Sequence, residues 1–194
     1  MKRRILVLLA HPSADSFNAA MANQYANAAR TAGAEVKVLR LGDLEFDPIL
    51  RLGYKGSQEL EPDLETAKQH IEWAEHLVVF TPVWWGTMPA LLKGFIDRVF
   101  LPGWAFEYSN KLPVKLLKGR TAQVVATMDS PGIWYRAVYR SSMHRTLGTA
   151  TLRFSGFKTK FRMLYSVRDS SESLRKKWLA QIETMATRQA SGAF

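Results

Sequence analysis

The chain has 194 residues, of which 47% are hydrophobic and 23% charged, and this mixture predicts one folded domain over residues 1–194 rather than a disordered chain. It contains no cysteine, which excludes disulfides, a thiolate nucleophile, and zinc or iron–sulfur sites held by cysteine. The formal net charge of +10 suits nucleic acid, an anionic membrane surface, a phosphorylated small ligand, or a basic exterior with no specific partner.

The N-terminus combines a basic start with an apolar run over residues 5–10, which a His-Pro pair ends. The run is too short for a signal peptide or a membrane span, so we expect a cytoplasmic protein without membrane insertion. Because it is apolar at every position, the run predicts a strand buried on both faces. A helix over residues 16–32 follows, with Asp15 or Ser16 as its cap.

The rest of the chain alternates short apolar runs with helical patterns. Further strands are expected at 35–41, 77–81, 121–128 and within 158–167. Further helices are expected at 62–76, 89–100, 134–147 and 170–188. Segments 42–61 and 101–119 are expected to be irregular. Asp169 is the expected cap of the last helix, with Glu172 three residues on as its capping-box partner.

Five apolar strands separated by helices predict an α/β fold, because such strands are buried in a parallel sheet that is covered on both sides. Crossovers of one hand then give a doubly wound open sheet with helices on both faces, and five strands suit the flavodoxin-like order 2-1-3-4-5. The alternative, a Rossmann-like order, needs a sixth strand. In a 2-1-3-4-5 sheet the ligand binds beyond the carboxyl ends of the strands, between the first and the third. We therefore expect the site in the loops after the first, third and fourth strands.

The loop after the first strand leads into a helix N-terminus, where free N–H groups and the helix dipole favour a phosphate. Ser16 and Asn18 can add hydrogen bonds, and His11 can donate one or carry partial charge. Neither G-x-G-x-x-G nor G-x-x-x-x-G-K-[ST] occurs, which argues against a Rossmann dinucleotide site and a P-loop ATPase. Simple helix capping, with His11 as a turn residue, is the alternative that needs no ligand.

The loop after the third strand carries two adjacent tryptophans, Trp84 and Trp85, followed by Gly86. Neighbouring side chains of an extended chain point in opposite directions, so the two indoles are difficult to bury together. An exposed aromatic pair suits stacking on a flat heteroaromatic ring, and the glycine permits close backbone approach. In the alternative, one tryptophan is in the core and the other in a dimer interface.

The loop after the fourth strand supplies two hydroxyls, from Thr127 and Ser130, and the carboxylate of Asp129. Tyr135 is a candidate proton donor or hydrogen-bond donor, with packing as the alternative. His144 lies among arginines on a basic helix that could receive a phosphate such as that of NADPH, with a solvated surface position as the alternative. Histidine spacing does not fit zinc, and no nucleic-acid-binding signature accompanies the basic and aromatic residues, so we expect neither partner.

Several strings share the order and spacing of one family over residues 5 to about 165, and the string at 82–100 is the most specific. They are His11-Pro12-x-x-x-Ser16-Phe17-Asn18, Phe46-Asp47-Pro48, Pro82-Val83-Trp84-Trp85-Gly86-Thr87-Met88-Pro89 with its continuation to Phe100, Gly103-Trp104-Ala105-Phe106-Glu107-Tyr108, and Leu117-Lys118-Gly119. In these strings the chain resembles the NAD(P)H:quinone oxidoreductase family. Its members are flavodoxin-like flavoenzymes, including the modulator-of-drug-activity and potassium-efflux ancillary proteins.

This resemblance implies a homodimer that carries FMN, or FAD, and passes hydride from NADPH or NADH through the flavin to quinones or other flat acceptors such as nitro and azo compounds. It implies that the flavin phosphate and ribityl chain are held by His11, Ser16, Phe17 and Asn18. It implies that the flavin ring is lined by Pro82, Val83, Trp84, Trp85 and Gly86, with Thr127, Asp129 and Ser130 nearby. Tyr135 and His144 correspond to a tyrosine and a histidine at the family's catalytic face.

Two other functions use the same flavin site. A flavodoxin-type electron carrier is one, although such carriers are typically acidic and this chain has a net charge of +10. A flavin-binding ancillary subunit of a membrane transporter is the other, with segment 42–61 and the basic surface as docking regions. The short chain, without an extension to cover an adenine, favours FMN over FAD.

Overall fold

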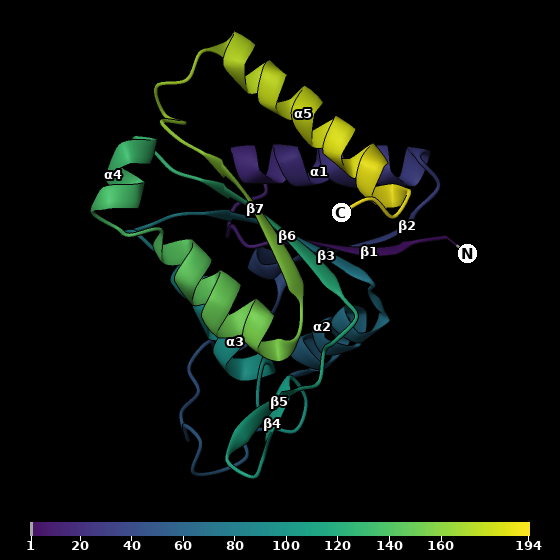
Figure 1. The fold of residues 1–194 in the computed structure, drawn as a ribbon, viewed down its shortest axis with the longest axis vertical. Coiled ribbons are helices and arrows are strands. Elements are labelled where there is room, and N and C mark those ends of the chain that lie inside the picture. The colour runs from purple at the N-terminus through teal and green to yellow at the C-terminus, as the bar shows by residue number, and fades with distance from the viewer. Residues whose placement is uncertain (1) are drawn as a thin grey trace.

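A five-stranded parallel sheet forms the centre of the computed structural model, which describes residues 2–194 (Figure 1). Its strands are β1 (Arg4–Leu9), β2 (Glu35–Arg40), β3 (His76–Pro82), β6 (Thr121–Thr127) and β7 (Lys158–Leu164). They lie in the order β2-β1-β3-β6-β7, and all four pairings are parallel. Since β6 and β7 are the fourth and fifth strands of this sheet along the chain, the predicted order 2-1-3-4-5 is confirmed.

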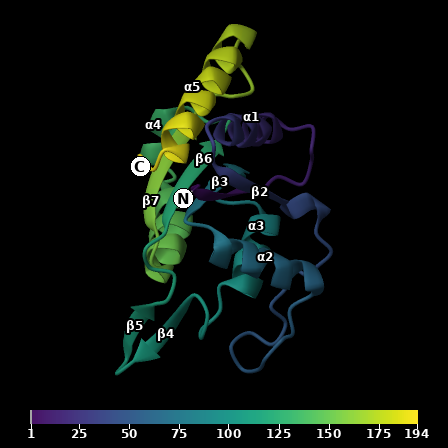
Figure 2. The same cartoon turned by 90° about the vertical axis from the view of Figure 1, so that its right-hand side faces the viewer.

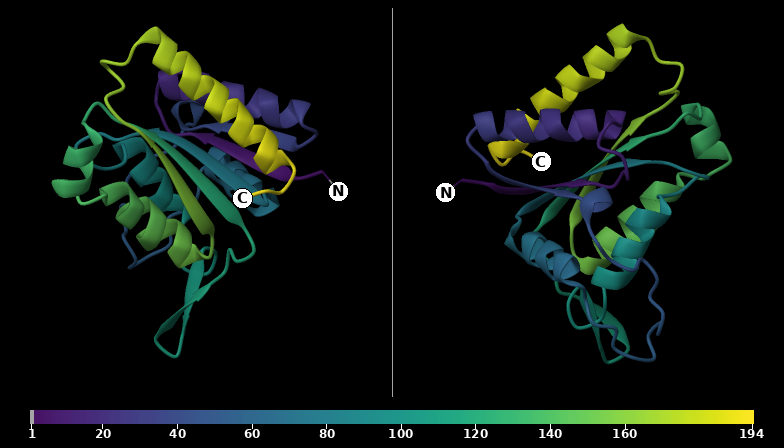
Figure 3. Two further views of the ribbon diagram at one scale, coloured as in Figure 1. Left: turned by 45° about the horizontal axis from the view of Figure 1, so that its top comes forward. Right: turned by 180° about the vertical axis from the view of Figure 1, so that it is seen from behind.

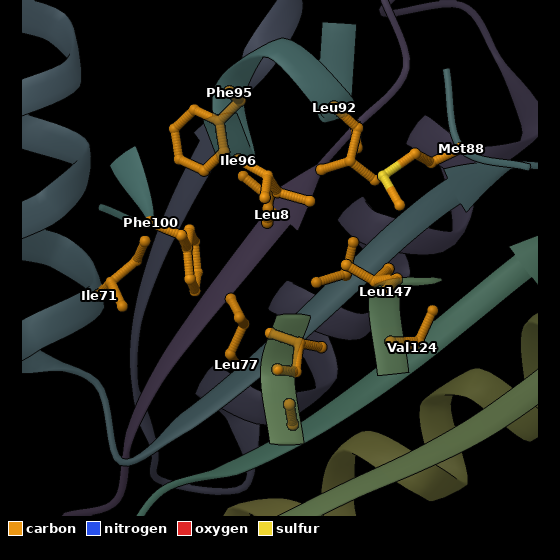
Figure 4. Packing of buried hydrophobic residues seen from close by; sticks show 14 of the residues in the cluster. Leu8, Ile71, Leu77, Met88, Leu92, Phe95, Ile96, Phe100, Val124 and Leu147 are labelled. Atoms are coloured by element: carbon orange, nitrogen blue, oxygen red, sulfur yellow. The ribbon is translucent and has the colours of Figure 1, made fainter. Parts of the chain in front are cut away.

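Helices cover both faces of the sheet, as Figure 2 and the rear view in Figure 3 show. One face carries α1 (Phe17–Thr31) and α5 (Glu172–Ala190), and the other carries α2 (Pro62–Trp73), α3 (Ala90–Val99) and the π-helix η2 (His144–Arg153). Successive residues of a strand face opposite sides, so Val7 packs under α1 whereas Leu8 packs toward α3 (Figure 4). Among the helices of residues 2–194, none has the length and apolar character needed to span a bilayer.

The segment 101–119 is not irregular as expected. It contains a hairpin of β4 (Phe106–Ser109) and β5 (Leu112–Lys115). Asn110 and Lys111 form its two-residue turn with φ angles of 51° and 65°, the left-handed pair that suits the twist of a hairpin. Lysine is an uncommon residue at such an angle, so the turn lacks the glycine that would have indicated it.

The expectation of a single helix at 134–147 is also wrong. The chain forms a short helix, α4 (Gly132–Ala137), and then breaks at Arg140 and Ser141, which have φ angles of 48° and 53°. It resumes as η2, where the hydroxyls of Thr149 and Thr151 donate to carbonyls five residues earlier. These side-chain bonds match the wider π-helical turn.

The structure shows which residues cap the first and the last helix of the chain. Ser16, one of two expected candidates, caps α1, and its Oγ accepts the Ala19 N–H at 3.1 Å. The expected Asp169 cap of α5 is wrong, because Ser171 Oγ accepts the Leu174 N–H at 3.2 Å. Asp169 is followed by two serines, which also cap helices, so the sequence alone does not fix where α5 begins.

Segment 42–61 has no regular structure beyond the 3₁₀ turn η1 (Leu41–Asp43), as expected, yet it is held firmly. Arg98 of α3 is completely buried and binds both carboxylate oxygens of Glu61, at 3.0 and 2.8 Å. Gly94 lets the segment pass close to α3, because a Cβ there would lie 2.4 Å from that of Pro48. The hydrogen bonds of Arg98 therefore hold the segment against α3, and the missing side chain of Gly94 makes room for it.

Candidate active site

Three loops meet where the strand order reverses, at the carboxyl ends of β1, β3 and β6. Val83, just after β3, donates its N–H to the Thr127 carbonyl at 2.7 Å. The Asn18 amide at the start of α1 donates to Thr127 Oγ1 at 2.9 Å. Residues far apart in the sequence are thus joined at one edge of the sheet, which is the convergence that the predicted topology requires.

The first loop folds into a tight turn before α1. The Ser13 N–H donates to His11 Nδ1 at 2.9 Å, and Ser16 Oγ donates to the Ser13 carbonyl at 3.0 Å. The His11 ring lies edge-on to the Trp84 indole, with 5.6 Å between ring centroids. This turn brings the two candidate ring-binding and phosphate-binding segments into contact.

Asn18 is the most informative side chain of the site. It is buried, and its Oδ1 has no hydrogen-bond partner, although its amide nitrogen is bonded to Thr127. A buried acceptor without a donor is unfavourable by about 1–3 kcal/mol, so such atoms are rare in folded proteins. The atom lies in the first turn of α1, where the leading backbone N–H groups also lack intrahelical partners. Both features indicate a ligand that carries hydroxyl groups and an anion.

The second loop is a two-residue turn closed by reciprocal hydrogen bonds between Trp84 and Thr87, at 2.9 and 3.0 Å. Its central residues, Trp85 and Gly86, have φ angles of 51° and 76°. A Cβ on Gly86 would lie 3.1 Å from the Tyr139 ring. Trp84 is 44% exposed whereas Trp85 is fully exposed, so both indoles are accessible but only Trp84 lies against the His11 turn.

The third loop is tied to the chain that follows β7. Asp129 forms an ion pair with Arg168 at 2.9 Å and also accepts the Arg168 N–H at 3.0 Å. Ser130 accepts the Ser166 N–H through its carbonyl at 3.4 Å. Sequence analysis did not select Arg168, although its position just past the end of the fifth strand places it at this same edge.

Tyr135 and His144 form a hydrogen-bonded pair beside the third loop, with 3.1 Å between the Tyr135 hydroxyl and His144 Nδ1. Tyr135 is completely buried, and His144 is half-buried and stacks on Phe161 at 4.1 Å. His144 is therefore not the solvated surface residue of the alternative hypothesis. Burial raises the pKa of Tyr135 and lowers the pKa of His144. The positive charge of Arg153 lowers the pKa of His144 further. Both groups are neutral at pH 7.

The comparisons with known proteins agree with this fold. A family model described as "Flavodoxin-like fold" matches residues 3–185. The chain belongs to this flavodoxin-like family. The NAD(P)H dehydrogenase [quinone] 1 of Cavia porcellus is 30% identical over 181 residues, which cover 80% of this chain and 66% of that protein. This chain spans slightly less than two thirds of the length of that protein, and 64% of the length of an uncharacterized NAD(P)H oxidoreductase of Haemophilus influenzae.

Two solved structures show the same fold. The NAD(P)H:quinone oxidoreductase of Methanothermobacter marburgensis has a TM-score of 0.81 at 22% identity, covering 97% of this chain and 100% of its own. An FMN-dependent NADH-azoreductase of Bacillus anthracis, solved in complex with FMN, has a TM-score of 0.76 at 18% identity, covering 97% and 99%. The predicted resemblance to the NAD(P)H:quinone oxidoreductase family is thereby confirmed.

In this flavodoxin-like protein, Phe17 and Phe161 have positions that sequence analysis did not foresee. Phe17 is the first residue of α1, and its ring packs beside Trp178 of α5, at 6.0 Å between centroids. Phe161 projects from β7 under η2 and supports His144. The periodicity of β7 places Phe161 on one face of the sheet, but only the structure shows what it touches.

Gly148 controls this support, because a Cβ there would lie 2.8 Å from the Phe161 ring. We expect Gly148→Ala to displace the ring and lower the free energy of unfolding by about 1–3 kcal/mol. As His144 loses its cover, its pKa should rise toward the usual range, which an NMR titration of the ring protons measures. In the double variant with Phe161→Leu the added methyl group has space, so the stability loss should be smaller than the sum of the single effects. A His144 titration unchanged in Gly148→Ala would contradict this arrangement.

Proposed function

We propose that this flavodoxin-like protein is a flavin-dependent oxidoreductase that passes two electrons from NADPH or NADH to quinones or similar flat acceptors, including azo and nitro compounds. The names of its relatives support the reaction class, and the azoreductase solved with FMN supports the cofactor. The observation that carries the proposal is the unpartnered, buried Oδ1 of Asn18 at a helix start beside the His11–Trp84 contact.

The residues at this edge fit FMN. Bound FMN supplies a carrier that accepts two electrons from a nicotinamide and releases them to an acceptor. The start of α1 would hold its phosphate and ribityl chain through His11, Ser16, Phe17 and Asn18. The turn after β3 would line its ring with Pro82, Val83, Trp84, Trp85 and Gly86, and the loop after β6 would approach it with Thr127, Asp129 and Ser130. FAD would use the same residues, with its adenine outside them.

Tyr135 and His144 hold a defined proton beside this edge. Burial raises the pKa of Tyr135, so its hydroxyl keeps its proton and donates a hydrogen bond to His144 Nδ1. The His144 proton is then on Nε2, where it can be donated to an acceptor that gains charge. Tyr135, which is fully buried, fixes the tautomer of His144 rather than touching the acceptor. His144 is the group of this pair that would contact the substrate.

The test is flavin binding and its reduction. The purified protein should retain or take up FMN, turn yellow, and be bleached directly by NADPH or NADH without air or a separate reductase. Direct reduction also separates the enzyme from an electron carrier, which requires a reductase. A protein that takes up no flavin on reconstitution overturns the proposal.

Asn18→Ala should weaken FMN binding about tenfold, because the ligand loses a buried hydrogen-bond partner. Quenching of flavin fluorescence on titration measures the dissociation constant. Asn23→Ala is the matched control on the same helix, since Asn23 is exposed and should leave binding unchanged. Equal affinities of the two variants would remove Asn18 from the site. The melting temperatures of the flavin-free variants exclude misfolding as the cause.

A homodimer in the cytoplasm is part of the proposal. Exposed apolar side chains gather on the long segment and on the hairpin, namely Ile49, Leu52, Tyr54, Tyr108 and Leu112. Tyr54 and Tyr108 also line a hollow of about 420 Å³ beside α3 and η2. Large apolar patches on a protein surface mark interaction sites, and a second copy of the chain is the proposed occupant. Sedimentation of the flavin-loaded protein measures its mass.

A further inference from the structure

A second hollow of about 460 Å³ lies between the edge strand β7 and α5. It forms because α5 packs along α1 rather than over β7, which leaves this face of the sheet uncovered at its β7 edge (Figure 1). The strand supplies Lys160 and Arg162 on this side, while Phe161 faces η2. The volume lies in the range of small-molecule sites, about 300–1,000 Å³.

The charge of this hollow is entirely positive among its lining side chains. Four cations line it: Lys160 and Arg162 from β7, and Lys177 and Arg188 from α5. Within residues 2–194, none of the four forms an ion pair. The acidic Glu183 of α5 is turned away and accepts a hydrogen bond from Gln24 of α1 at 2.8 Å. Four cations without counter-charges predict an anionic ligand.

The floor of the hollow is suited to a flat ring rather than to an anion alone. Gln123 and Gln189 are buried there, at 4% and 5% exposure, and join weakly at 3.4 Å. Met185 and the Phe194 ring supply apolar surface beside these amides, and Lys160 Nζ lies 4.9 Å from the centre of the Phe194 ring. Small-molecule pockets combine apolar walls with a few polar groups, such as amides, that fix the orientation of the ligand.

We propose that this hollow binds a phosphorylated heteroaromatic compound of the nucleoside monophosphate class. The phosphate would lie among the four cations. The ring would lie over Met185 with its polar edge toward Gln123, because Gln189 Oε1 already accepts hydrogen bonds from Tyr25 and His76. The site is on the α5 face of the sheet, whereas the proposed flavin site is at the carboxyl ends of the strands. It is therefore a binding function in addition to the proposed oxidoreductase.

Calorimetric titration of the full chain with AMP tests the proposal. The chain is first loaded with FMN, so that the phosphate site at the start of α1 is filled, and unbound FMN is removed because it would compete with AMP for the hollow. AMP should bind one site per chain, and adenosine and inorganic phosphate should each bind at least about tenfold more weakly. Phosphate that binds as tightly as AMP would overturn the ring-binding part. Absence of AMP binding would overturn the whole proposal.

Variants locate the binding. Lys177→Gln and Arg188→Gln should each weaken AMP binding about tenfold. Lys176→Gln is the matched control, because Lys176 is the residue before Lys177 on α5 but pairs with Glu172 at 2.7 Å. Ala180→Phe should fill the hollow and abolish AMP binding. Equal AMP affinity in Lys177→Gln and Lys176→Gln would overturn the site, and circular dichroism of each variant confirms that it is folded.

Discussion

Arg98→Ala is expected to lower the free energy of unfolding by about 3–5 kcal/mol, because it empties a completely buried site and leaves the half-buried Glu61 carboxylate without its cation. Besides both Glu61 oxygens, the Arg98 guanidinium binds the Glu59 carbonyl at 2.7 Å and the Asp47 carbonyl. Since these partners all belong to segment 42–61, the segment should detach from α3. Urea denaturation followed by circular dichroism measures the loss.

A matched control lies in the same segment. Arg51 pairs with Asp47 at 2.6 Å, but its side chain is 64% exposed, so Arg51→Ala should change stability by only about 0–1 kcal/mol. Arg98→Lys keeps the charge and loses the forked geometry, so its stability should fall between those of the wild type and Arg98→Ala. Because Tyr54 belongs to the proposed dimer face, Arg98→Ala should also weaken self-association. Equal losses for Arg51→Ala and Arg98→Ala would refute the anchoring role.

The fold and the position of the site follow from local features of the sequence. Runs such as 77–81 are apolar at every position, and only a strand covered on both sides buries them fully. Once the strand order is known, the carboxyl ends of the first, third and fourth strands must lie together. The contact between His11 and Trp84 is the result of that rule.

Features that depend on distant partners could not be predicted in this way. A charged residue such as Arg98 is expected on the exposed side of a helix, and only the acidic segment that crosses α3 makes its burial favourable. The break at Arg140 has no glycine or proline to indicate it. The hollow beside β7 depends on where α5 packs, and periodicity within α5 does not specify its neighbour.

His76 should make the stability of the protein depend on pH between about 6.5 and 4. Its ring is completely buried at the start of β3, with Nδ1 2.7 Å from Thr121 Oγ1 and Nε2 3.0 Å from Gln189 Oε1. The same Gln189 oxygen accepts the Tyr25 hydroxyl at 2.6 Å, so Nε2 must carry the proton of a neutral ring. Burial lowers the pKa of His76 to about 4, and the nearby positive charge of Arg3 adds to this effect, while the hydrogen bond to Gln189 partly opposes it.

The direction of the effect follows from the two pKa values of His76, about 6.5 in the unfolded chain and about 4 in the folded protein. As the pH falls below 6.5, the unfolded chain takes up the proton first, so the stability present above this pH is lost progressively down to pH 4. The loss amounts to roughly 3 kcal/mol. His76→Gln cannot take up this proton, so its stability should fall less over the same range, although it is less stable than the wild type at pH 8. Urea midpoints at several pH values measure the difference between the two curves, and parallel curves would show that the pKa of His76 is the same in the folded protein as in the unfolded chain.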